Sequence, residues 1–134
     1  MAKVSVKAEL KQENQYYTKV TAGNHTIYTD EPIDKGGEDK GMNPLELLAA
    51  SLATCTAATL KMYVLLKNWE VPTIDVDVAL ENDNKSGEAL FERSISFGDA
   101  NLTEDQQKRL LSIAERCPVH KLLHGKIGIK TAIL

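Results

Sequence analysis

Residues 41–67 read GMNPLELLAASLATCTAATLKMYVLLK, and this stretch decides how the rest of the chain can fold. Asn43 is a suitable helix N-cap, and Pro44 fits the first helical position, where its missing N–H costs nothing. No glycine or proline follows until Pro72, so we expect one helix about 35 Å long. Spacings of three and four predict a single buried face made of Leu45, Leu48, Leu52, Cys55, Thr59, Met62 and Leu66.

The middle of this helix is rich in alanine, serine and threonine, and Cys55 lies at its centre. Small side chains let neighbouring backbones approach closely, so we expect the helix to be buried on several faces, in part by a second subunit. Cys55 is therefore either a small core side chain, as buried free cysteines usually are, or a thiol held at a fixed place in a pocket.

The composition is that of a soluble globular protein. The 134 residues suffice for one domain with a real core, and 43% are hydrophobic and 26% charged. A net charge of −3 gives no electrostatic footprint for nucleic acid. The uncharged run 47–60 is shorter than the roughly 20 residues that span a bilayer, and the charged, alternating N-terminus is not a signal peptide. We expect a cytoplasmic protein without nucleic-acid or membrane partners.

The remaining sequence predicts an α+β fold with an antiparallel sheet, in a single domain covering residues 1–134. Polar residues 31–40 form a loop before the long helix, a natural lid or pocket edge. Thr103 and Gln106 predict a capping box for a second helix, which Pro118 ends, followed by a short and possibly helical turn over 119–124. Alternating apolar residues predict strands at 4–10, 15–20, 26–30, 74–80, 90–97 and 127–133.

The second cysteine, Cys117, is expected at the C-terminus of the second helix. There the helix dipole disfavours a thiolate, whereas Cys55 in mid-helix escapes this penalty and has hydroxyls at Ser51 and Thr59 one turn away. Two cysteines are too few for a disulfide scaffold, so they are either inert core thiols or a redox couple. If they are a redox couple, this reasoning assigns the attacking thiolate to Cys55.

The motif GMNPLELLAASLATCTAATL, together with RCPVH at residues 116–120, resembles the OsmC/Ohr family of osmotically inducible and organic-hydroperoxide-resistance proteins. The resemblance covers essentially the whole chain. It implies an intertwined homodimer, with long central helices packed between antiparallel sheets and active sites at the dimer interface. It also implies a thiol-dependent peroxidase in which Cys55 attacks a peroxide and Cys117 resolves the product.

In that mechanism Cys55 becomes a sulfenic acid and condenses with Cys117 to a disulfide. A small external dithiol or a dihydrolipoyl protein then restores both thiols, so no bound cofactor is expected. The alternative from another class is a non-enzymatic OsmC-fold protein that binds an apolar small molecule in the same pocket.

The chain departs from the family's peroxidases at two positions. Those enzymes have a glutamate directly after Asn-Pro, where this chain has Leu45, and Glu46 would lie about 180° from Cys55 on an ideal helix. They also use an arginine from the N-terminal segment, whereas the first arginine here is Arg93. The candidates for the missing cation are Lys19, His25 and Arg93.

The late histidines allow a further interpretation. Cys117, His120 and His124 follow the pattern C-x-x-H-x-x-x-H, to which Cys55 could add a fourth zinc ligand. We nevertheless predict no metal site, with both histidines as polar residues of the last turn and His120 as a candidate proton donor. Before the loop, His25, Asp30 and Glu31 are either an acid/base set or ordinary turn residues.

Overall fold

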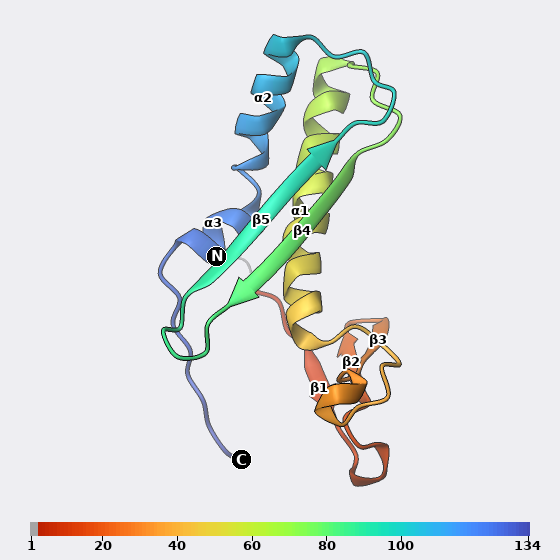
Figure 1. The fold of residues 1–134 in the computed structure, drawn as a ribbon, viewed down its shortest axis with the longest axis vertical. Coiled ribbons are helices and arrows are strands. Elements are labelled where there is room, and N and C mark those ends of the chain that lie inside the picture. The colour runs from red at the N-terminus through yellow and green to blue at the C-terminus, as the bar shows by residue number, and fades with distance from the viewer. Residues whose placement is uncertain (1–2) are drawn as a thin grey trace. The chain divides into compact units, whose positions relative to one another are not determined.

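The computed structural model describes residues 3–134, which form two compact units, residues 3–48 and residues 49–134 (Figure 1). The long helix α1 (Pro44–Lys67) begins in the first unit and continues through the second. Small antiparallel sheets and helices together confirm the predicted α+β fold class. The assignment of the whole chain to a single domain stays a prediction.

The first unit is a three-stranded antiparallel meander with the strand order β1-β2-β3. The strands are β1 (Lys7–Glu9), β2 (Thr18–Ala22) and β3 (His25–Thr29), and short 3-10 helices cover Gln12–Asn14 and Ile33–Lys35. Strands β2 and β3 pair in the register Ala22↔His25, with Gly23 at a φ of 60° in the turn between them. The left-handed conformation is one that glycine adopts without strain.

Asp30 organises the polar loop that leads into α1. Its carboxylate accepts backbone N–H groups from Glu31 at 2.8 Å, Glu38 at 3.3 Å and Lys40 at 3.1 Å. Burial raises the pKa of Asp30, but the amides of Lys40, Glu31 and Glu38 outweigh it and hold the pKa below its ordinary value. Asp30 is thus committed to loop structure, which argues for turn residues here and against an acid/base set.

Helix α1 starts where the sequence predicted. The Glu46 N–H donates to the Asn43 side chain at 2.8 Å, and the Asn43 N–H donates to the Glu46 carboxylate at 2.9 Å. This reciprocal pair is a capping box, and it satisfies two N–H groups that the first helical turn leaves open. The carboxylate of Glu46 therefore has a structural role.

The predicted buried face of α1 is only partly buried within the described chain, at Leu52, Cys55 and Thr59. The buried residues of α1 are spaced four positions apart: Leu52, Thr56, Leu60 and Val64. On the predicted face, Met62 and Leu66 are 69% and 75% exposed. Both stripes are apolar, so spacing alone could not show which one the single chain covers.

The second unit packs a hairpin and two further helices against α1 (Figure 1). Strands β4 (Asp75–Asn82) and β5 (Ala89–Ser96) pair along their whole length, and α2 (Glu104–Ala114) and α3 (Pro118–His124) follow. The predicted capping box of Thr103 and Gln106 is present at α2. The buried core of the unit consists of Leu60, Val64, Val71, Leu110, Ile113 and Ala114.

The C-terminal segment forms no strand, contrary to the alternation at 127–133. Ile129 and Ile133 are 86% and 99% exposed. A strand exists only when a neighbour accepts its ladder hydrogen bonds, and no strand pairs with this segment in the described chain. The alternating sequence therefore remains without a partner in the isolated subunit.

By length and composition α1 resembles a membrane-spanning helix, although this is weak evidence because core helices meet the same criterion. Leu60 and Val64 on α1 are fully enclosed by the core of the second unit. Within the described chain, 28% of the most apolar 18-residue window of α1 is buried.

Candidate functional site

The structure brings the two cysteines together. Cys55 comes from the middle of α1 and Cys117 from the junction of α2 and α3, and the two side chains are near enough to shift each other's pKa. Both are free thiols. Cys55 is partly exposed, whereas Cys117 is completely buried. The fold thus unites the two site residues that the sequence predicted.

Cys117 begins a helix instead of ending one. Helix α2 stops at Ala114, and Cys117 is the N-cap of α3, where its Sγ accepts the backbone N–H of His120 at 3.4 Å. The expectation that Cys117 faces a helix C-terminus was therefore wrong. The cause is that the chain makes a single turn after Ala114 and then restarts at Pro118, a favoured first helical residue.

This placement sets the pKa values of the two thiols in opposite directions. Burial raises the pKa of Cys117, but hydrogen bonds from Cys55 and from the backbone N–H groups of His120 and Val119 outweigh it, and the pKa falls. Burial, followed by the contact with Cys117, raises the pKa of Cys55. The environment thus favours a negative charge on Cys117, contrary to the argument from helix position.

Arg93 on β5 connects the elements around the thiols. Its Nη1 donates to Oγ1 of Thr56 at 3.0 Å, and its Nη2 lies 3.0 Å from Nδ1 of His120. Thr56 is completely buried, and its hydroxyl also donates to the Leu52 carbonyl at 2.6 Å. Among the described residues Arg93 forms no ion pair with a carboxylate. A half-buried guanidinium therefore bonds to Thr56 and His120 without a carboxylate counter-ion.

His120 is held as a neutral ring. Since a guanidinium only donates, Nδ1 of His120 accepts from Arg93 and the ring proton lies on Nε2. Burial lowers the pKa of His120, as do the charges of Arg93 and His124, while Glu115 acts in the opposite direction. The Nε2–H group can therefore donate a hydrogen bond, while the lowered pKa disfavours the protonated ring that a proton donor needs, so the proton-donor role of His120 stays a prediction.

The sequence carried a signal for Arg93. Its neighbours on the same face of β5 are Phe91 and Ile95, and all three are half-buried, while the residues between them are exposed. An arginine in an otherwise apolar inward alternation must find polar partners. The other two candidate cations, Lys19 and His25, are exposed residues of β2 and β3 in the first unit.

No group of three or more His, Cys, Asp or Glu side chains within residues 3–134 is arranged to hold a metal ion. The rings of His120 and His124 instead stack, with centroids 5.1 Å apart and an interplanar angle of 3°. The Nδ1 of His120 is already occupied by Arg93.

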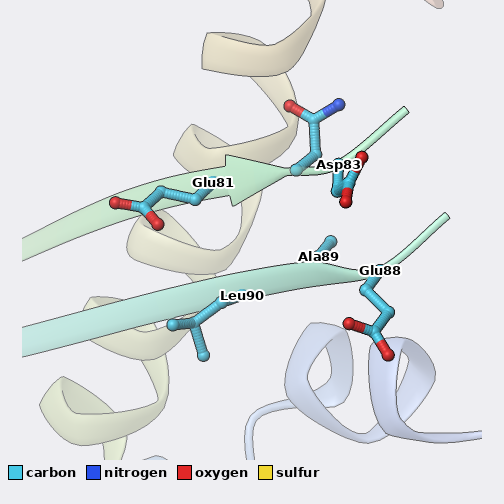
Figure 2. A pocket seen from close by; sticks show the side chains of 6 residues that line it. Glu81, Asp83, Glu88, Ala89 and Leu90 are labelled. Atoms are coloured by element: carbon cyan, nitrogen blue, oxygen red, sulfur yellow. The ribbon is translucent and has the colours of Figure 1, made fainter. Parts of the chain in front are cut away.

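A groove of about 390 Å³ lies between β5 and α2 and reaches the site at Arg93. Four apolar residues and four polar or charged ones line it: Ile95, Phe97, Leu110 and Leu111, with Arg93, Glu104, Gln107 and Lys108. A second hollow, at the turn that connects β4 to β5, has Glu81, Asp83 and Glu88 among its lining residues (Figure 2). Figure 2 shows the Glu81 carboxylate directed away from the other two, so this hollow forms no acidic cluster.

The fold and the site define an α+β protein with a paired-thiol centre. The family profile described as OsmC-like protein matches residues 37–132, so the chain belongs to this family. The OsmC/Ohr resemblance drawn from the sequence motifs is thereby confirmed. No curated protein matches the chain significantly.

Solved structures share the fold at low sequence identity. A protein from Psychrobacter arcticus, provisionally described as an osmotic stress induced and detoxification response protein, has a TM-score of 0.75 and is 22% identical to this chain. The match covers 90% of this chain and 88% of that protein. An OsmC-like protein from Mycoplasma pneumoniae has a TM-score of 0.73 and 21% sequence identity, and the match covers 92% of this chain and 89% of that protein. The organic hydroperoxide resistance protein OhrB of Bacillus subtilis has a TM-score of 0.61 and 23% sequence identity, and the match covers 92% of both chains.

Proposed function

We propose that this protein is a thiol-dependent peroxidase that reduces organic or small hydroperoxides through Cys55 and Cys117. The observation that carries the proposal is the contact between a partly exposed thiol and a buried one whose pKa is lowered. Several relatives of the same fold are named organic hydroperoxide resistance proteins, including the one from Bacillus subtilis.

In the proposed reaction the sulfur of Cys55 attacks the terminal oxygen of the hydroperoxide and becomes a sulfenic acid. Cys117 then displaces hydroxide from that sulfur and forms a disulfide, while an alcohol and water leave. The two thiols supply both electrons. An external dithiol or a dihydrolipoyl protein returns them by thiol–disulfide exchange, so the protein needs no bound cofactor.

The working form that we propose is a homodimer in the cytoplasm. The apolar stripe of α1 at Met62, Leu65 and Leu66 is at least 61% exposed in the isolated subunit. Exposed apolar stripes of this kind mark protein–protein contacts, and a reducing compartment keeps free thiols reduced. A second subunit would cover this stripe.

The groove between β5 and α2 favours a second candidate function, binding of an apolar small molecule with little turnover. Its lining combines four apolar side chains with polar and charged ones, Arg93 and Lys108 among them, which is the usual composition of a small-molecule pocket. The peroxidase is preferred because a binding protein has no use for two thiols in contact.

The test is dithiol-dependent consumption of cumene hydroperoxide by the wild type and by the Cys55→Ser and Cys117→Ser variants. The control is Ser94→Ala, an exposed position on the other face of β5. Turnover that is lost in both cysteine variants and kept in the control supports the peroxidase. Absence of turnover in the wild type, with either dithiothreitol or dihydrolipoamide, would favour the binding function.

A further inference from the structure

We propose that the groove between β5 and α2 is a binding site for a small apolar monocarboxylate, with the carboxylate on Arg93 and the hydrocarbon part along the apolar side chains. Neither cysteine lines this groove, so the inference does not depend on peroxide turnover. It goes beyond the peroxidase proposal, and it gives the second candidate function a ligand class and an orientation.

Arg93 is a half-buried cation for which the described chain supplies no anion. Its Nη1 donates to Oγ1 of Thr56, and its Nη2 lies 3.0 Å from Nδ1 of the His120 ring, so both partners are neutral groups. A guanidinium has more N–H donors than these two bonds use, and they form a planar fork that matches a carboxylate. Its remaining donors therefore favour an anionic group that comes from outside residues 3–134.

The groove places an apolar surface next to this cation. Arg93 and Ile95 lie on one face of β5, Phe97 continues their alternation, and α2 contributes Leu110 and Leu111. Leu110 is completely buried, whereas Leu111 is 64% exposed, so the groove is open to solvent on the side of α2. Its volume of about 390 Å³ is in the range of small-molecule sites. A hydrocarbon chain that entered it would cover exposed apolar surface.

The direction of the elements gives the groove a length. Helix α2 runs back along β5 (Figure 1), so Phe97 and Glu104 lie at one end and Arg93 lies toward the other. At about 3.3 Å per residue, the path from Arg93 to Phe97 is about 13 Å, which suits a chain of about eight carbons.

The charges along the groove determine which way round the ligand binds. Lys108 adds a second cation to the lining, and Glu104 is its acidic residue. Within the described chain Glu104 forms no ion pair with either cation, so the lining keeps a net positive charge. Because Glu104 repels an anion at its own end, the carboxylate lies at the Arg93 end and the chain points toward Phe97.

The experiment is isothermal titration calorimetry of the reduced full-length chain with sodium octanoate, in the absence of peroxide. Octylammonium and octanol carry a similar chain with a cationic and a neutral head group. The variants are Arg93→Met, Arg93→Lys and Leu111→Glu, the last of which brings a negative charge into the groove. Since Leu111 is exposed, this variant tests the proposal even if Arg93→Met does not fold. The matched control is Ser112→Glu, an exposed neighbour that does not line the groove.

We expect octanoate to bind more tightly than octylammonium and octanol. Its Kd should rise by about tenfold or more in Arg93→Met and in Leu111→Glu, and less in Arg93→Lys, while Ser112→Glu stays near the wild type. Equal binding of octylammonium, or octanoate binding that is unchanged in every folded variant, would refute the proposal.

The titration also separates this inference from the peroxidase. A wild type that does not bind octanoate would refute the carboxylate site, whatever its peroxide turnover. A wild type that binds octanoate in the expected pattern but consumes no hydroperoxide would support the carboxylate site and refute only the peroxidase.

Discussion

Arg93 on β5 donates a hydrogen bond to Thr56 on α1, with Nη1 of the arginine 3.0 Å from Oγ1 of the threonine. The bond joins the hairpin to the long helix beside Cys117. Of the three candidate cations, Arg93 is the one that bonds to residues of α1 and α3. The same arginine reaches His120, so one side chain links three elements around the thiols.

We predict that Thr56→Val destabilises the protein by about 1–3 kcal/mol, because valine keeps the shape but leaves the Arg93 donor without its buried acceptor. The measurement is urea denaturation. The matched control is Thr54→Val, since the exposed Thr54 hydroxyl makes the same type of bond, to the Ala50 carbonyl at 2.8 Å. That variant should stay within about 0.5 kcal/mol of the wild type, and equal losses in the two variants would contradict the account.

Stability should fall as the pH drops below 6.5, in part because of His120. The folded protein lowers the pKa of this ring from 6.5, through burial and the charge of Arg93, so acid protonates the unfolded chain first. The stabilisation is complete above 6.5 and is lost as the pH falls through the folded pKa. In urea titrations from pH 8 to pH 5, His120→Gln should flatten this decline. His25→Gln, at an exposed strand position, should leave it unchanged.

Glu46 is predicted to matter for the start of α1 and not for catalysis. Asn43→Ala removes the N-cap side chain and should cost about 1 kcal/mol in thermal or urea unfolding. Glu46→Gln keeps an oxygen that can accept the Asn43 N–H, so both stability and peroxide turnover should stay close to wild type. A large loss of turnover in a stably folded Glu46→Gln variant would show that the carboxylate has a chemical role.

The apolar stripe of α1 should govern assembly. Leu66→Asp places a charge on a side chain that is 75% exposed in the isolated subunit, so it should weaken a dimer while leaving the fold of the subunit intact. Analytical ultracentrifugation of the wild type, Leu66→Asp and the exposed control Lys61→Asp measures this directly. A wild type that sediments as a monomer at all concentrations would refute the predicted homodimer.

The sequence was informative where the determinants are local. Asn43-Pro44 predicted the start of α1, and Thr103 and Gln106 predicted the capping box of α2, because caps depend on residues three positions apart. The motif around Cys55, with Cys-Pro later in the chain, identified the family. The contact between the two thiols followed only from that resemblance.

What the sequence could not determine depends on segments that meet through the fold. The end of α2 at Ala114 made Cys117 an N-cap and reversed the electrostatic argument about the thiols. The partners of Arg93 come from α1 and α3, and no spacing rule connects them. The segment 127–133 has the alternation of a strand, but a strand requires a neighbour that the isolated chain does not provide.

The most direct test of the central claim is to titrate the reduced protein with cumene hydroperoxide and to count the remaining thiols. One equivalent per chain should remove both thiols, and peptide mapping should recover Cys55 joined to Cys117 within the same chain. Retention of both thiols after excess hydroperoxide, or oxidation of Cys55 without any bond to Cys117, would contradict the proposal of a redox pair.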